Sequence, residues 1–137
     1  MSEEITLIAK PENSNAVKAF VFAQIADYEC SPRTAMAIEL SLDEIFVNIA
    51  SYAYADEAGE VTVQVEVEGD PATLSVTFID HGVPYNPLEK EDPDLSLSVE
   101  ERQIGGLGIF LVKKKMDVVE YEFRDGQNIL TIKKTLL

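Results

Sequence analysis

Residues 31–54 read SPRTAMAIELSLDEIFVNIASYAY, and this stretch predicts the helix around which the chain folds. Ser31 is a favoured N-cap residue, and Pro32 suits the first helical position because the N–H that it lacks would have no partner there. At about 100° per residue, the apolar side chains gather on one side of such a helix. They are Ala35, Ile38, Leu42, Ile45, Phe46, Ile49 and Ala53. We therefore expect a helix over residues 31–54 that buries this side in the core.

Two polar residues of this helix, Glu44 and Asn48, lie at the edge of its apolar side. They are four positions apart, so their side chains lie one above the other. Asn48 offers an amide oxygen to a hard cation such as Mg²⁺, and Glu44 offers a base beside a metal-bound phosphate. An exposed Glu and a half-buried Asn are also ordinary on a helix surface. The pair alone therefore leaves both interpretations open.

The composition limits the class of protein. With 137 residues and 46% hydrophobic content, the chain fits one domain with its own core. A net charge of -14 disfavours nucleic-acid binding, which needs a basic surface, and suits a basic protein partner. With one cysteine, Cys30, and one histidine, neither an internal disulfide nor an ordinary zinc site is expected. The acidic N-terminus and the lack of an apolar run of about 20 residues predict a cytoplasmic protein without membrane contact.

The remaining elements are predicted from the spacing of apolar residues. We expect an edge strand at 5–9, a helix from Asn13 or Ser14 to Tyr28, a hairpin with strands 61–67 and 73–79, a helix at 109–115 opened by 104–108, and a final hairpin with strands 118–123 and 129–132. Residues 84–103 lack periodicity and read as a long functional loop. This order predicts an α+β two-layer sandwich, in which a mixed, mostly antiparallel sheet carries its helices on one face.

The strand ending near residue 80 runs into Asp80-His81-Gly82. A carboxylate there can accept a hydrogen bond from an exocyclic amine such as that of adenine, and Gly82 lets the backbone come close to a ring. A simple turn cap explains the same residues equally well. His81 has no Ser or Cys partner in a catalytic pattern, so it is expected at the surface.

The glycines of Gly105-Gly106-Leu107-Gly108 open the helix that follows. Backbone N–H groups without side chains, together with the positive end of a helix, bind phosphate well. The stretch matches neither of the well-known phosphate loops, because no Gly-Lys-Ser/Thr follows it and no strand directly precedes it. A hinge for the preceding loop is the alternative, and phosphate binding is the favoured interpretation.

Taken in order, these motifs resemble those of the Bergerat-fold ATPases, the histidine-kinase-like superfamily that includes gyrase. The order is Glu-x-x-x-Asn on a helix, Asp-x-Gly at a strand end, a long lid, and Gly-x-Gly opening a helix. Within the superfamily the chain looks most like the small anti-sigma regulatory factors that are serine/threonine protein kinases. The resemblance covers nearly the whole chain. It implies one ATP-binding domain over residues 1–137, with an ATP lid at about 84–104.

The resemblance implies a role for each matched residue. Asn48 would ligate Mg²⁺, and Glu44 would activate the serine hydroxyl of a protein substrate. Asp80 would bond the adenine amine, and Gly82 would border the base. The further ATP contacts implied are Gly106, Leu107 and Gly108 at the phosphates, Gly105 at the turn of the lid, Arg102 at the γ-phosphate, and Asn128 near the adenine. Two positions depart from the family pattern: Pro84 stands where many relatives have a second glycine, and Tyr52 where a histidine is common.

The implied activity is that of an ATP- and Mg²⁺-dependent serine/threonine protein kinase acting as an anti-sigma regulatory factor. Its substrate would be an anti-anti-sigma (STAS-type) protein, and its second partner would be a sigma factor. The resemblance also implies that the chain forms a homodimer. An ATP-binding regulatory module that controls a partner by lid ordering, without phosphate transfer, is the alternative. The chain has no room for the phosphoacceptor helix pair of a sensor histidine kinase. The acidic charge and the missing transducer domain disfavour a DNA-remodelling ATPase.

Overall fold

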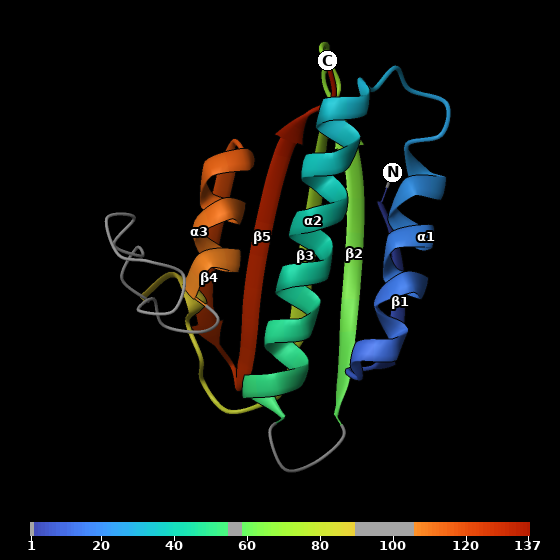
Figure 1. The fold of residues 1–137 in the computed structure, drawn as a ribbon. Coiled ribbons are helices and arrows are strands. Elements are labelled where there is room, and N and C mark those ends of the chain that lie inside the picture. The colour runs from blue at the N-terminus through green and yellow to red at the C-terminus, as the bar shows by residue number, and fades with distance from the viewer. Residues whose placement is uncertain (1, 55–58, 90–105) are drawn as a thin grey trace, which may run out of the picture.

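A computed structural model describes residues 2–54, 59–89 and 106–137. Eight regular elements follow one another in the order β-α-α-β-β-α-β-β (Figure 1). They are β1 (Ser2–Ile8), α1 (Ser14–Gln24), α2 (Pro32–Asn48), β2 (Glu60–Glu68), β3 (Thr73–Asp80), α3 (Gly106–Lys115), β4 (Val118–Arg124) and β5 (Gln127–Thr135). Residues 90–105 lie outside the described residues, and they include most of the lid expected at about 84–104 as well as Arg102 and Gly105.

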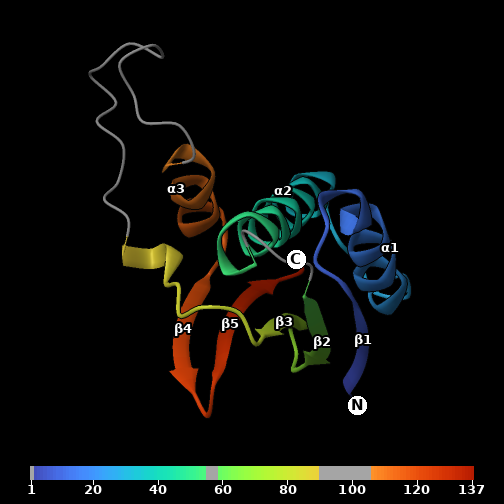
Figure 2. The same ribbon diagram turned by 90° about the horizontal axis from the view of Figure 1, so that it is seen from below.

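The five strands form one sheet in the order β1-β2-β3-β5-β4. All four of its pairings are antiparallel, so the described sheet contains none of the parallel pairing that a mixed sheet would have. Two of the pairings, β2 with β3 and β4 with β5, are hairpins, which are antiparallel by construction. Figure 2 shows α1, α2 and α3 on the same side of this sheet. The expected α+β two-layer architecture is confirmed, and β1 lies at an edge as predicted.

The central helix begins as the sequence predicts. The Ser31 side chain accepts a hydrogen bond from the Thr34 backbone N–H at 3.1 Å, and Pro32 occupies the first turn. Its apolar side enters the same core cluster as the inward side chains of β2 and β3. Ile38, Leu42 and Phe46 have no exposed surface there. Helix α2 therefore lies over the middle of the sheet and fixes where its C-terminal residues point.

Two helix ends differ from the expected bounds. The α-helical part of the central helix stops at Asn48, and residues Ile49–Ala53 continue as a π-helical turn. This turn aims the Ala53 carbonyl at the backbone N–H of Val83, which donates to it at 3.1 Å. Helix α1 ends at Gln24 rather than at Tyr28, because the Ile25 N–H bonds the Phe22 carbonyl and tightens the last turn. The sequence pattern does not contain the tertiary contact that causes the π-helical turn.

Candidate functional site

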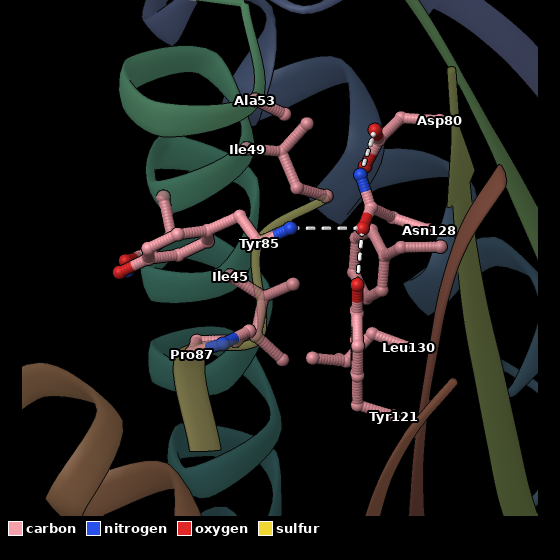
Figure 3. A pocket seen from close by; sticks show the side chains of 11 residues that line it. Ile45, Ile49, Ala53, Asp80, Tyr85, Pro87, Tyr121, Asn128 and Leu130 are labelled. Carbon is pink, nitrogen blue, oxygen red and sulfur yellow. Dashed lines mark hydrogen bonds between the residues drawn. The ribbon is translucent and has the colours of Figure 1, made fainter. Parts of the chain in front are cut away.

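A pocket of about 350 Å³ lies between the C-terminal half of the central helix and the ends of β3, β4 and β5 (Figure 3). That figure includes open solvent; the room that a water-sized molecule can occupy in the pocket is about 20 Å³, enough for about one water. Most of its wall is apolar, and the polar side chains converge from α2, β3, β4, β5 and the segment after β3. The lining residues are Ile45, Asn48, Ile49, Ala53, Phe78, Asp80, Tyr85, Pro87, Tyr121, Asn128 and Leu130.

Asp80 reaches this pocket because of its position in the alternation of β3. Leu74, Val76 and Phe78 face the helices, and Asp80 is the next residue in phase with them. Its carboxylate is therefore carried into the apolar layer, where the residue is only 2% exposed. Burial raises the pKa of Asp80, while hydrogen bonds from Asn128 and the Gly82 N–H and the charge of His81 oppose the rise. A buried carboxylate at the wall of a pocket is suited to a ligand that donates a hydrogen bond.

Gly82 follows Asp80 at a point where the chain has no room for a side chain. A Cβ on Gly82 would lie 2.7 Å from the Ala53 carbonyl carbon, a distance that real Cβ atoms do not adopt. The Gly82 N–H also donates to Asp80 Oδ1 at 2.9 Å. The sequence predicted a close approach of the Gly82 backbone to a ring, and the close approach in the structure is a different one. It is made to the π-helical turn at Ala53, and it fixes the end of β3 against the central helix.

Asn48 carries a buried amide oxygen for which the protein provides no partner. The side chain is 8% exposed, and its Nδ2 donates to the Glu44 carbonyl at 2.7 Å, one turn back. Its Oδ1 accepts no hydrogen bond from the described residues. An unpaired buried carbonyl oxygen is costly unless a ligand takes it. It fits Mg²⁺, which is usually held by one or two protein oxygens together with substrate phosphates and water.

Glu44 lies beside the first turn of α3 and not in the pocket wall. A Cβ built on Gly108 would lie 2.6 Å from the Glu44 carboxyl carbon, so any other residue there would make the Glu44 side chain shift. Burial, and then the neighbouring charge of Asp43, raise the pKa of Glu44. A carboxylate with a raised pKa is a stronger base than an ordinary one. The fold thus places a basic carboxylate against the helix start that was predicted to hold phosphate.

Among the described residues, no three His, Cys, Asp or Glu side chains gather in a way that would hold a metal by themselves. In the same part of the chain, no helix is both long and apolar enough to cross a membrane.

The sequence pattern of the histidine kinase-like ATPase domain family matches residues 7–134. The chain belongs to this family. The match runs from β1 to β5 and so includes every pocket residue named above. The resemblance seen in the motifs is confirmed at the level of the family.

Individual relatives of this histidine kinase-like ATPase domain include named protein kinases. It is 29% identical over 102 residues to the serine/threonine-protein kinase BtrW of Bordetella bronchiseptica, covering 74% of this chain and 71% of that protein. It is 28% identical over 100 residues to the serine-protein kinase RsbW of Bacillus mycoides, covering 70% of this chain and 61% of that protein. The matched region is thus less than two thirds of the RsbW protein.

Two solved structures share the fold of this histidine kinase-like ATPase domain. The structure of the RsbU and RsbW domains of Rv1364c from Mycobacterium tuberculosis superposes with a TM-score of 0.68 at 17% identity, covering 99% of this chain and 32% of that chain. The histidine kinase domain of the blue-light activated kinase EL346 from Erythrobacter litoralis gives a TM-score of 0.53 at 17% identity, covering 92% of this chain and 60% of that chain. At such identities the likeness shows the fold.

Within this histidine kinase-like ATPase domain, the predicted residues occupy different places. Asn48, Asp80 and Asn128 meet in one pocket, Gly82 lies at its edge, and Glu44 and Gly108 contact each other beside it. Gly106 and Leu107 are the first residues of α3, so the helix includes part of the glycine stretch and begins earlier than the expected 109.

Three tyrosines of the site were missed by the sequence analysis. Tyr121 and Tyr85 line the pocket. Tyr85 also stacks on Tyr52, with ring centroids 4.9 Å apart, so the residue that departs from the family pattern has a packing role here. The Tyr54 hydroxyl accepts from the His81 N–H at 2.7 Å and donates to the Glu60 carbonyl at 2.9 Å. The alternation along β4 would have placed Tyr121 on the same face as Val119, which is the available signal.

Replacing Asp80 by Asn should change how the free energy of unfolding depends on pH. Because the pKa of Asp80 is raised above its ordinary value of 3.8, the folded chain keeps a proton that the unfolded chain has already lost. As the pH rises from 3.8 to the raised pKa of Asp80, the free energy of unfolding of wild type should therefore fall relative to that of Asp80→Asn. Above the raised pKa, the difference between the two free energies should stay constant. Denaturant unfolding of both proteins across the acid range measures this. A difference that stays constant throughout would contradict the raised pKa.

Proposed function

We propose that this chain is an ATP- and Mg²⁺-dependent serine/threonine protein kinase that acts as an anti-sigma regulatory factor and phosphorylates a STAS-type anti-anti-sigma protein. The observation that carries the proposal is the pocket that combines the buried Asp80 carboxylate with the unpaired Asn48 oxygen, next to the contact of Glu44 with α3. The names of the related kinases from Bordetella and Bacillus support it. Within the proposal, residues 1–137 act as one ATPase domain with its lid at about 84–104.

The pocket would hold the nucleoside end of ATP. Asp80 would accept a hydrogen bond from the 6-amino group of adenine, and the apolar wall formed by Ile49, Phe78 and Leu130 would enclose the ring. Exclusion of water from this wall strengthens the hydrogen bond to the carboxylate. The base would thereby be oriented with its phosphates directed along the central helix toward α3.

The first turn of α3 would bind the phosphates. Gly106 and Leu107 contribute backbone N–H groups that have no partner within a helix, and the helix dipole adds positive potential at this end. Gly108 leaves the space that the Glu44 carboxylate occupies. Arg102 and Gly105, which precede α3, are kept in the proposal as phosphate and lid residues. This end of α3 would therefore attract anions, although the motif lacks the lysine of the well-known phosphate loops.

Asn48 would hold Mg²⁺ through its Oδ1, together with phosphate oxygens and water. When bound, the ion neutralises charge that develops on the transferred phosphoryl group. Glu44 would take the proton of the substrate serine hydroxyl while that oxygen forms a bond to the γ-phosphorus and the bond to the ADP oxygen breaks. The raised pKa of Glu44 suits this step, because the carboxylate binds the proton more strongly than an ordinary Glu does.

The proposed partners follow from the related kinases and from the charge. A STAS-type protein would be the phosphate acceptor, and a sigma factor would be the second, alternative partner. The net charge of -14 disfavours direct contact with nucleic acid. A homodimer and a cytoplasmic location belong to the same proposal.

The direct test is phosphate transfer. The purified chain is incubated with Mg²⁺, ATP labelled at the γ-phosphate and a STAS-domain protein from the same genome, and the products are analysed for phosphoserine. We expect labelled phosphoserine on the STAS protein and none when EDTA removes the metal. Binding of ATP without any labelled partner would contradict the kinase function.

A second function is favoured by one observation. Glu44 does not line the pocket, and its carboxylate lies against Gly108 outside it. If it stays there, ATP would act as a ligand that orders the lid and controls a protein contact without transfer. Single-turnover experiments separate the two functions, since the regulatory module would bind its partner in an ATP-dependent way and form no phosphoprotein.

A further inference from the structure

Asn128 occupies the centre of a hydrogen-bond network in the pocket (Figure 3). Its Nδ2 donates to Asp80 Oδ1 and to the Val83 carbonyl, each at 2.9 Å. Its Oδ1 accepts from the Tyr85 backbone N–H at 3.1 Å and from the Tyr121 hydroxyl. A primary amide has two donors and about two acceptor sites. All of them are used by the protein itself.

This saturation has two consequences for the side chain. Asn128 has no hydrogen-bonding capacity left for a ligand, so the direct contact expected from the resemblance is not available in this arrangement. Its orientation is also fixed, because a flipped amide would direct its NH₂ group at the Tyr85 and Tyr121 donors and its oxygen at the Asp80 carboxylate. Any hydrogen-bonding effect of Asn128 on a ligand must therefore pass through Asp80, the Val83–Tyr85 segment or Tyr121.

We propose that Asn128 is a positioning residue that makes the pocket selective for a purine carrying a 6-amino group, by holding Asp80 so that one carboxylate oxygen is reserved for the ligand. The proposal rests on the proposed function, since it concerns the same nucleotide pocket. It adds the residue that determines which base is accepted.

The carboxylate of Asp80 shows how the selection would work. Oδ1 receives both protein donors, the Asn128 amide and the Gly82 N–H. Within the described residues, no hydrogen bond uses Oδ2. Cross-strand pairing places Asp80 directly opposite Asn128, so the division between the two oxygens is built into the register of β3 and β5. An amine can donate to Oδ2, whereas a 6-oxo group would present lone pairs to it and be rejected.

The test compares binding of ATP and of inosine triphosphate, which carries a 6-oxo group in place of the amine. Isothermal titration of the full chain with each nucleotide gives the ratio of the two dissociation constants. In Asn128→Leu, a change of similar shape without the amide, we expect this ratio to fall about tenfold, the size of one modest hydrogen-bond contribution. A purely structural role would weaken both nucleotides equally and leave the ratio unchanged, and that outcome would overturn the inference.

A matched control comes from the opposite face of the same two strands. The hydroxyls of Thr77 on β3 and Thr131 on β5 form a hydrogen bond of 3.2 Å outside the pocket. Thr131→Val removes this cross-strand bond and should keep the wild-type ratio. If Asn128→Leu does not fold, Asn128→Ser takes its place, since its hydroxyl is too short to span the distance to Asp80. An equally large fall of the ratio in Thr131→Val would also overturn the inference.

A readout without nucleotide separates this inference from the proposed function. NMR titration of the Asp80 carboxyl carbon in the free protein should give a higher pKa in Asn128→Leu than in wild type, because a donor to the charged form is lost. An unchanged pKa would overturn the positioning role even if ATP binds. If wild type binds neither nucleotide, the proposed function fails and the selectivity fails with it, whereas ATP binding with an unchanged ratio overturns the selectivity alone.

Discussion

Glu44→Gln should lower the rate of phosphate transfer to the protein substrate by about 10²–10⁴-fold, the usual contribution of a general base. The variant keeps the size of the side chain and removes the carboxylate that lies against Gly108. ATP affinity should change little, because Glu44 is not part of the pocket wall. Single-turnover transfer and nucleotide titration on the same protein measure the two quantities.

The control for this experiment is Glu39→Gln. Glu39 is an exposed residue earlier on the same helix, so its replacement changes the net charge identically without reaching Gly108 or the pocket. It should transfer phosphate at the wild-type rate. Equal rates for Glu44→Gln and wild type would show that another group accepts the proton, and would leave Glu44 with a packing role.

Asn48→Ala should remove the dependence of ATP binding on Mg²⁺. The change deletes the buried oxygen that has no partner among the described residues and leaves the neighbouring apolar wall in place. Loss of a metal ligand should weaken ATP binding in Mg²⁺ by at least about 10–100-fold, because loss of a residue that only hydrogen-bonds a metal ligand already costs that much. ATP titrations with Mg²⁺ and with EDTA measure it, and wild type should show a large difference between them.

Asn48→Asp is the matched variant for this measurement. It keeps an oxygen at the same position, so the difference between Mg²⁺ and EDTA should persist. Both variants lose the Nδ2 bond to the Glu44 carbonyl, so loss of that bond alone cannot explain a difference between them. A Mg²⁺ effect that survives in Asn48→Ala would place the metal on other residues.

The central helix shows which structural features can be predicted from the sequence alone. Its start is predictable because the N-cap and the proline act within a few residues, and the observed bond from Thr34 to Ser31 agrees with it. Its π-helical end is not predictable in the same way. That turn is held by the contact of Ala53 with Gly82 and Val83, which are distant in sequence. Local rules contain no information on a contact of this kind.

The pocket also combines residues whose positions can be predicted from the sequence with residues whose positions cannot. The inward position of Asp80 follows from the alternation of β3, and the buried edge position of Asn48 follows from helical spacing. The role of Asn128 depends on the register between β3 and β5, which pairs it with a residue 48 positions away. The contact between Glu44 and Gly108 depends on how two helices pack. Such long-range pairings come from the assembled sheet and core, and the motifs give only the residue types that take part.

We propose that Asp80 selects and binds the adenine of ATP in this pocket. Titration of ATP into wild type and into Asp80→Asn tests it directly. In the variant, the Asn128 and Gly82 donors hold the new amide oxygen at the Oδ1 position and leave an NH₂ group facing the ligand amine. We predict one ATP site in wild type and an affinity at least about tenfold lower in Asp80→Asn, as expected for a lost hydrogen bond to a charged group. Equal affinities in the two proteins, or no binding by wild type, would contradict the account.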